Sequence, residues 1–275
     1  MMQLEIRDIE IGYRQRSGEF RRLAAHLSLN VPGGRSIALL GRNGSGKSTL
    51  LRVLSGVRRP QSGSVLLDGV ELDRLSPRMR AQRIAFVTTE PIVTAHLRVR
   101  EVVAMGRAPY TGWFGTLSRD DERRVDRALD QVGLSSFGEK SLDSLSDGER
   151  QRAMIARAVA QDTPLILLDE PTAFLDLPNR YRTALLLRRL AHESGKTVIY
   201  SSHDLTTAVQ LCDTLWVMNR GGIDAGRPAD LLRDGTVDTL FDDLPIRCSE
   251  DGAIRFEASS PTDGATPLPY SSSRK

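Results

Sequence analysis

Residues 41–48 read GRNGSGKS and match the phosphate-loop pattern G-x-x-x-x-G-K-[ST]. The apolar run SIALL (36–40) comes directly before this stretch, and TLLRVLSG (49–56) follows it. This order predicts a buried strand, a glycine loop and a helix in direct succession, which is the context in which the pattern binds phosphates. No other feature of the chain restricts its fold as much, because the loop belongs to α/β architectures.

The side chains of this loop suit nucleotide phosphates and a magnesium ion. Its glycines let the backbone wrap closely around phosphate oxygens, because they have no side chain in the way. Lys47 is placed to reach the outer phosphates, Ser48 to ligate Mg²⁺, and Thr49 to add a donor. We therefore expect ATP and Mg²⁺ as ligands. The candidate nucleotide-binding residues of the loop are Gly41, Arg42, Asn43, Gly44, Ser45, Gly46, Lys47, Ser48 and Thr49.

The run LILL (165–168) ends in two neighbouring carboxylates. A continuous apolar run is typical of a strand buried on both faces, and ligands of an α/β sheet bind at the C-terminal ends of its strands. Asp169 is the candidate Mg²⁺ ligand, acting through water. Glu170 is the candidate general base for a water aimed at the γ-phosphate, since the metal needs only one carboxylate.

LSDGERQR (145–152) supplies a second feature that suits a phosphate. It reads as the start of a helix, with Ser146 as the cap and Glu149 three residues later, as in a capping box. A helix start has free N–H groups and a partial positive charge. The phosphate loop already provides one phosphate site, so these residues alone leave open what the second helix start binds.

The order of elements predicts an α/β fold with additions. Alternating apolar residues in 3–13 and 26–31 indicate antiparallel strands near the N-terminus. Residues from about 98 to 160 have helical patterns, and short apolar runs at 164–170, 197–202 and 214–220 indicate buried strands. From about residue 257 the chain is rich in Ser, Pro and Gly without an apolar period, which predicts a flexible tail.

Composition excludes several classes. With 275 residues, 40% hydrophobic and 27% charged, the chain has the make-up of an ordinary soluble protein. It has no apolar run of about 18 residues that would span a membrane, and its first residues lack the apolar region of a signal peptide. Cys212 and Cys248 form no metal or redox spacing, which fits the cytosol. The net charge of +3, with arginines mixed among acids, favours a solvated surface over a nucleic-acid footprint.

Five motifs in fixed order carry a resemblance: the phosphate loop, LSDGERQR, LLDEP, AFLD and SSHD. Over about residues 3–240 the chain resembles the nucleotide-binding subunit of an ABC transporter. The resemblance implies a P-loop NTPase fold of ABC type, with an N-terminal antiparallel β subdomain and a helical insertion. It implies an ATP-binding domain at 1–245 with a helical subdomain at about 90–162, and a C-terminal extension at 246–275.

The resemblance also answers the question raised by the second helix start. In this family two subunits pair head to tail, and each ATP lies between the phosphate loop of one and the signature helix of the other. LSDGERQR is the signature, so Ser146 and Gly148 would contact the γ-phosphate of the partner's ATP. Tyr13 fits the aromatic residue that stacks on adenine, Asp176 the loop that lines the dimer seam, and His203 the switch histidine on the γ-phosphate.

Two departures from the family pattern stand out. The usual signature is LSGGQ, whereas here Asp147 and Glu149 replace Gly and Gln. Asp147 weakens phosphate binding if it faces the nucleotide and costs little if it turns outward. The family also has a metal-contacting Gln after the strand that we place at 84–87, where this chain has Thr89 and then Glu90. Ligation by Thr89, ligation by Glu90 and a loop without metal contact all stay open.

The run VREVVAMGRAPY (99–110) resembles subunits of importers for iron–siderophore complexes, haem and vitamin B12. We therefore expect an ATPase subunit that is peripheral on the cytoplasmic face of the cell membrane. Its partners would be a second copy, integral membrane permease subunits and, indirectly, a substrate-binding protein, but no nucleic acid. The aromatic stretch PYTGWFG (109–115) either packs against the permease or forms a local core. The alternatives are a non-transport ABC ATPase of DNA repair or translation, and an exporter subunit.

Overall fold

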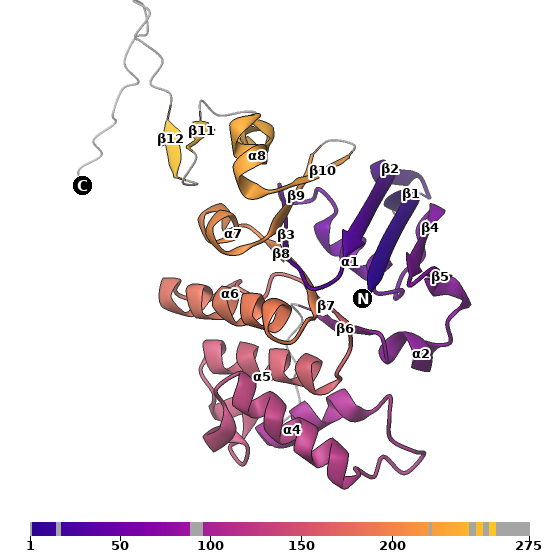
Figure 1. Cartoon of the computed structure of the whole chain (residues 1–275), viewed down its shortest axis with the longest axis vertical. Helices are drawn as coiled ribbons and strands as arrows, with labels where there is room; N and C mark the ends of the chain where they lie inside the picture. Colours follow the sequence, from indigo (N-terminus) through magenta and orange to yellow (C-terminus); the bar gives the residue numbers. More distant parts are fainter. Residues whose placement is uncertain are drawn as a thin grey trace, which may run out of the picture.

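The computed structural model describes residues 2–14, 18–88, 96–219, 222–241, 246–249 and 253–256. An antiparallel sheet of order β2-β1-β4-β5 occupies one side of the molecule (Figure 1). Leu4, Ile6, Ile9 and Ile11 of β1 are buried, as their alternation predicts. The strands of this sheet are β1 (Gln3–Arg14), β2 (Phe20–Pro32), β4 (Ser62–Leu67) and β5 (Val70–Glu71).

A second sheet of order β10-β9-β3-β8-β7-β6 forms the centre of the fold. Its strands are β3 (Ser36–Gly41), β6 (Ile84–Val87), β7 (Leu165–Leu168), β8 (Thr197–Ser202), β9 (Thr214–Met218) and β10 (Ile223–Gly226). All its pairs are parallel except β9 with β10. The C-terminal ends of β3, β7 and β8 therefore meet at one edge, which gathers the residues that follow them.

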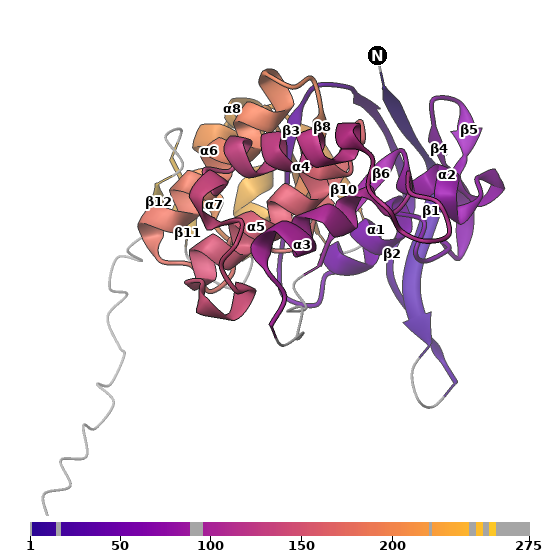
Figure 2. The same ribbon diagram turned by 90° about the horizontal axis from the view of Figure 1, so that it is seen from below.

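Alternate residues of the central sheet face two separate cores. On β3, Ile37 and Leu39 pack in the core shared with the antiparallel sheet and α1 (Lys47–Leu54). Ala38 and Leu40 pack in the core formed with the larger helices. Figure 2 shows α3–α7 together on one side and the antiparallel strands on the other. This division explains the continuous apolar runs, because each central strand is covered on both faces.

The helices that the sequence indicated at about 98–160 are separate and pack against one another. They are α3 (Val99–Ala104), α4 (Arg119–Gln131) and α5 (Asp147–Ala160). Arg107, which is 4% exposed, ties them together: its Nε donates to Asp121 Oδ1 at 2.8 Å, and its Nη1 to the carbonyl of Ala160 at 2.7 Å. The other helices are α2 (Pro77–Ala81), α6 (Leu177–His192), α7 (Leu205–Leu211) and α8 (Pro228–Arg233).

The aromatic stretch between α3 and α4 does not form the local core that was one of its two interpretations. Trp113 and Phe114 are 98% and 92% exposed. Only Tyr110 packs, with its ring 3.9 Å below the guanidinium carbon of Arg107. The loop is nevertheless anchored at its base, where Arg78 Nε and Gln82 Nε2 donate to the carbonyl of Pro109.

Near the C-terminus, β11 (Ile246–Cys248) and β12 (Ile254–Phe256) form a short hairpin. The tail that we expect from about residue 257 lies outside the described residues. None of the described helices is long and apolar enough to cross a membrane.

Candidate nucleotide-binding site

The predicted phosphate loop lies between the end of β3 and the start of α1. Gly46, the residue before the helix, has φ of 113°, which is a conformation that glycine adopts without strain. A Cβ atom on Gly41 would lie 2.7 Å from Ser45 Oγ and 3.0 Å from the carbonyl oxygen of Met218, so a side chain would clash there. These glycines are needed by the shape of the loop itself, as the motif predicts.

Lys47 is held beneath the loop, where it is 5% exposed. Its Nζ donates to the carbonyl of Gly41 at 2.8 Å and of Arg42 at 3.4 Å. Burial lowers the pKa of Lys47, although the nearby carboxylates of Glu170 and Asp169 raise it. Ser45 Oγ is buried without a hydrogen-bond partner among the described residues. The loop thus has a cation and an unused hydroxyl, both suited to phosphate oxygens.

The candidate metal ligands Ser48 and Asp169 are brought into contact. Ser48 Oγ donates to Asp169 Oδ1 at 3.0 Å, although 121 residues separate them in the chain. A hydroxyl and a carboxylate are the hard oxygen donors that Mg²⁺ takes, usually with one or two carboxylates and the substrate's phosphates. The described residues contain no cluster of three or more His, Cys, Asp or Glu that would hold a metal alone. Thr89 and Glu90 lie outside the described residues.

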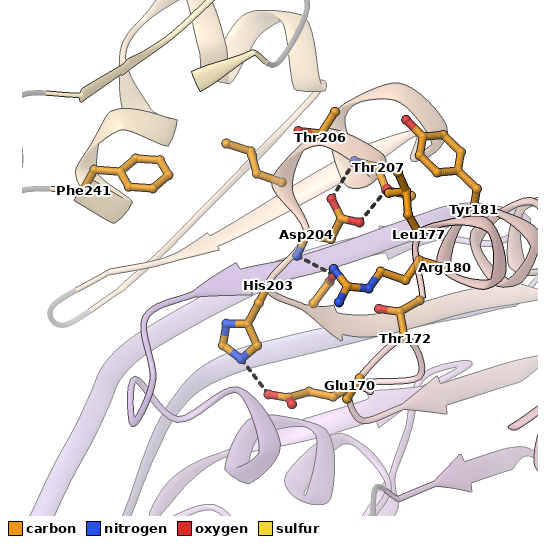
Figure 3. Close-up of a pocket in the computed structure, with 13 residues that line it drawn as sticks. Glu170, Thr172, Leu177, Arg180, Tyr181, His203, Asp204, Thr206, Thr207 and Phe241 are labelled. Carbon is orange, nitrogen blue, oxygen red and sulfur yellow. Dashed lines mark hydrogen bonds and ion pairs between the residues drawn. The ribbon is translucent and has the colours of Figure 1, made fainter. Parts of the chain in front are cut away.

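Glu170 and His203 meet directly beside this pair. His203 Nε2 lies 2.7 Å from Glu170 Oε1, and Figure 3 shows the two side chains pointing towards each other among the residues that line a pocket. The pocket has a volume of about 570 Å³ and extends towards Leu177 and Tyr181. Glu170 has φ of 47°, which is uncommon for a residue with a side chain. Such strain is characteristic of functional sites, so it supports a role for this carboxylate.

Tyr13 lines the same site from the antiparallel sheet. It is 36% exposed and borders a pocket of about 260 Å³ together with residues of the phosphate loop and Glu170. Arg21, which faces Tyr13 across β1 and β2, donates from Nη1 to the Tyr13 hydroxyl at 3.3 Å. No motif in the sequence marks Arg21, and only the pairing of β1 with β2 places it beside Tyr13.

The signature residues form the predicted helix start. Ser146 Oγ accepts from the backbone N–H of Glu149 at 3.3 Å. In turn, Glu149 Oε2 accepts from the backbone N–H of Ser146 at 2.8 Å. Asp147 turns outward, with its side chain 74% exposed and its Oδ1 3.0 Å from Arg150 Nη1. Within one chain the carboxylate is thus paired with Arg150, and its effect on the partner's nucleotide stays a prediction. A Cβ atom on Gly148 would lie 3.0 Å from the side chain of Asn179.

Two predicted parts of the site do not come together within one chain. The pocket beside the phosphate loop is lined by residues of 13–49 and by Glu170, and no described residue of 145–152 lines it. Asp176 caps α6, where its Oδ1 accepts from the N–H of Asn179 at 3.0 Å. Phe174, two residues earlier, is 93% exposed with φ of 62°.

A buried parallel sheet with a phosphate loop, a hydroxyl–carboxylate pair and an adjacent Glu–His pair defines a P-loop nucleotide-binding protein. The family model described as ABC transporter matches residues 24–173. The chain therefore belongs to the ABC transporter family. Its relatives in that family are ATP-binding proteins, and the chain is an ATPase of this class, as the motifs predicted.

Named relatives match over most of the chain. An achromobactin transport ATP-binding protein of Dickeya dadantii is 37% identical, over 88% of this chain and 88% of that protein. A cobalamin import ATP-binding protein of Halobacterium salinarum is 40% identical, over 80% of this chain but only 55% of the relative. A ferric enterobactin transport ATP-binding protein of Escherichia coli is 35% identical, over 82% of this chain and 83% of the relative.

Solved structures agree on the fold. An inward-facing metal-chelate type ABC transporter, described as putative, has a chain with a TM-score of 0.77 and 28% identity, covering 93% of this chain and 96% of its own. A dimeric ATP-binding cassette in a post-hydrolysis state, bound to ADP and Pi, gives a TM-score of 0.71 at 27% identity. That match covers 82% of this chain and 98% of the cassette. The expected fold class is thus confirmed.

Proposed function

We propose that this chain hydrolyses ATP at the site described above to power import of a metal chelate through a separate membrane permease. The observation that carries the proposal is the convergence of Lys47, Ser48, Asp169, Glu170 and His203 from separate elements at one edge of the sheet. These groups provide what phosphoryl transfer to water needs: charge neutralisation, a metal position and a base.

The hydrolysis step assigns a role to each group. Lys47 binds the β- and γ-phosphates, and Tyr13 stacks on the adenine. Glu170 accepts a proton from the water whose oxygen attacks the γ-phosphorus, and the bond to the β-phosphate oxygen breaks to leave ADP and phosphate. His203, whose Nε2 lies 2.7 Å from Glu170 Oε1, holds this carboxylate in place and exchanges that contact for a hydrogen bond to the γ-phosphate when ATP is bound.

Ser48 and Asp169 fit Mg²⁺ and would hold it, with Thr89 or Glu90 as a further ligand. The ion, when bound, neutralises charge on the phosphates. The variants Thr89→Ala and Glu90→Ala test which of these two residues ligates Mg²⁺. The variant of the true ligand needs more Mg²⁺ for half-maximal ATPase activity, and an unchanged requirement in both variants would exclude both residues as ligands.

The complete site requires a second copy of the chain. Ser146 and Gly148 are absent from the pocket beside their own phosphate loop, and the N-terminus of a Ser-capped helix suits a γ-phosphate. In a head-to-tail pair each signature supplies this helix start to the other subunit's ATP. The dimeric form of a similar cassette supports this arrangement.

The class of cargo follows from the relatives. Three of them are named for import or transport of achromobactin, ferric enterobactin and cobalamin. We therefore propose an iron–siderophore, haem or cobalamin compound as cargo, delivered by a substrate-binding protein to permease subunits on which this chain sits at the cytoplasmic face. The domain at 1–245, with its helical part at about 90–162 and the extension at 246–275, remains part of this proposal.

Vesicles containing the permease and this chain test the function. Uptake of a labelled ferric siderophore, haem or cobalamin should require ATP, Mg²⁺ and the binding protein. A matched preparation with Lys47→Ala should show none. ATP hydrolysis by the wild-type chain without uptake of any of the three would refute the cargo class. Absence of Mg²⁺-dependent ATP hydrolysis would refute the whole proposal.

A further inference from the structure

Ser201 is a fully buried residue at the C-terminal end of β8, with 0% of its surface exposed. The strand lies between β3 and β7. On one side Ser201 pairs with Leu39 of β3, and on the other Tyr200 pairs with Leu168, the residue before Asp169. The two neighbouring strands are thus those that lead into the phosphate loop and into the paired carboxylates.

The hydroxyl of Ser201 connects Asp169 and Glu170. Ser201 Oγ donates to Asp169 Oδ1 at 2.7 Å and accepts from the backbone N–H of Glu170 at 2.8 Å. A serine hydroxyl has a single proton, so the bond to Asp169 fixes where that proton points. A lone pair on the same oxygen then accepts from the N–H of Glu170. The buried oxygen of Ser201 is therefore hydrogen-bonded to both acidic residues and restrains the position of each.

The contact with Glu170 acts on a strained backbone. Glu170 has φ of 47°, in a region that residues with a side chain seldom occupy. Such conformations persist when the surrounding structure holds them. The bond from its N–H to Ser201 is a contact that does so, and from this backbone position the Glu170 side chain reaches His203.

The contact with Asp169 supports the candidate metal ligand. Asp169 Oδ1 accepts from Ser48 Oγ at 3.0 Å as well as from Ser201. Ligation of a metal ion would engage a lone pair of Ser48 Oγ, and the position of the ion would then help to set where its O–H points. The bond from Ser201 is independent of the ion, because Ser201 Oγ is already engaged by Asp169 and by the N–H of Glu170. Ser201 is therefore a second, separate donor that orients the Asp169 carboxylate.

We propose that Ser201 is a positioning residue that aligns Asp169 and Glu170 for hydrolysis through one hydroxyl group. The inference rests on the proposed function of those two residues. Ser201 touches neither substrate nor metal; it acts through its neighbours, as the partners of metal ligands do in other sites. Ser201 is the first residue of the SSHD motif, in which His203 alone was assigned a role.

Substituting Ser201 by Ala and by Thr tests this role. Ser201→Ala should lower kcat by roughly 10- to 100-fold and raise the Mg²⁺ concentration for half-maximal activity, as loss of such partners does elsewhere. The KM for ATP should change by less than about threefold, because the groups that bind the nucleotide are untouched. Ser201→Thr keeps the hydroxyl and should recover most of the rate.

The matched control is Ser36→Ala. Ser36 is also buried, at 1% exposure, but its hydroxyl donates to the Cys212 sulfur at 3.8 Å, and the residue begins β3, at the end away from the phosphate loop. It should lose stability without a change in Mg²⁺ requirement. If Ser201→Ala does not fold, Ser201→Cys, with a weaker donor of similar size, takes its place.

Some outcomes would contradict the role of Ser201 and leave the proposed function intact. Wild-type kcat and Mg²⁺ requirement in folded Ser201→Ala or Ser201→Cys would do so. Equal losses in the Thr and Ala variants would also contradict it, because the hydroxyl would then not matter. Failure of the proposed function is recognised separately: Glu170→Gln would hydrolyse ATP at the wild-type rate, whatever the Ser201 variants did.

Discussion

His203 Nε2 lies 2.7 Å from Oε1 of Glu170, and the two residues come from segments that follow neighbouring parallel strands, β8 and β7. The histidine is therefore engaged with the carboxylate that we propose as the base. Under the proposed function, the γ-phosphate of ATP lies next to this pair.

Glu170→Gln should retain ATP binding and lose turnover by roughly 10²- to 10⁴-fold, because an amide does not accept the proton of the attacking water. The variant should also accumulate as an ATP-bound dimer, which size-exclusion chromatography detects. Glu193→Gln, on the exposed end of α6, is the control and should behave like the wild type. Hydrolysis at the normal rate in Glu170→Gln would remove this residue from the mechanism.

Tyr13→Ala should weaken ATP binding by about tenfold or more, because stacking of a base on an aromatic ring contributes roughly 1–3 kcal/mol. Tyr13→Phe keeps the ring and loses only the hydroxyl that accepts from Arg21, so its affinity should remain close to wild type. Titration with a fluorescent ATP analogue measures both. An unchanged affinity in Tyr13→Ala would mean that the adenine lies elsewhere.

Mixing two inactive variants should restore one ATP site. Lys47→Ala damages a phosphate loop, and Gly148→Asp places a charge in a signature. In a head-to-tail pair both damaged elements fall in the same composite site, so the other site is intact. Each mutant homodimer has two damaged sites instead.

The readout for this mixture is ATP trapped between subunits, counted per confirmed mixed dimer, together with the ATPase rate. Because a Cβ atom on Gly148 would lie 3.0 Å from the Asn179 side chain, thermal melting must first show that the Gly148 variant folds. Mixed dimers that form and trap no ATP would contradict the shared-site arrangement.

Trp113→Ser together with Phe114→Ser should reduce the ATPase stimulation that the permease gives, and leave the basal rate unchanged. Both side chains are almost fully exposed on a loop anchored at Pro109, so the substitutions remove no packing. Aromatic residues are enriched where proteins meet. Val57→Ser, at a residue 73% exposed outside this loop, is the control. Equal stimulation in all three proteins would show that the loop does not contact the permease.

Asp121→Asn should destabilise the helical insertion by roughly 3 kcal/mol at pH 7, because it leaves the buried Arg107 without its ion partner. The hydrogen bond from the Ser118 side chain, with that from Arg107, lowers the pKa of Asp121 to about 2. Since the folded-state pKa lies below the ordinary value of 3.8, this stabilisation is present above pH 3.8 and is lost as the pH falls towards 2.

Urea denaturation at pH 7, 5 and 3 checks this prediction. The difference in unfolding free energy between wild type and Asp121→Asn should be constant from pH 7 to 5 and smaller at pH 3. The exposed Asp120, paired with Arg124, is the matched control, and its Asn variant should lose less stability. If the difference in unfolding free energy grew as the pH fell, the lowered pKa of Asp121 would be contradicted.

The sequence by itself determined the features that depend on local interactions. The GRNGSGKS loop, the buried run before Asp169 and the capping box of Ser146 and Glu149 are encoded by residues close together in the chain, and the structure contains each of them. The strands β1, β2, β3, β7, β8 and β9 were equally predictable, because alternation or continuous apolarity records which faces are covered, whereas β5, β10, β11 and β12 were not predicted. The extent of β2 was not: it begins at Phe20, where pairing with β1 continues beyond the alternating stretch.

Only the tertiary structure decided how distant segments meet. The bond between Ser48 and Asp169, the contact of His203 with Glu170 and the buried hydroxyl of Ser201 arise because parallel pairing brings the C-terminal ends of β3, β7 and β8 to one edge. The exposure of Trp113 was likewise visible only in the structure. Sequence patterns record each segment's own period, whereas these contacts depend on strand order and register, which long-range packing of the two cores selects.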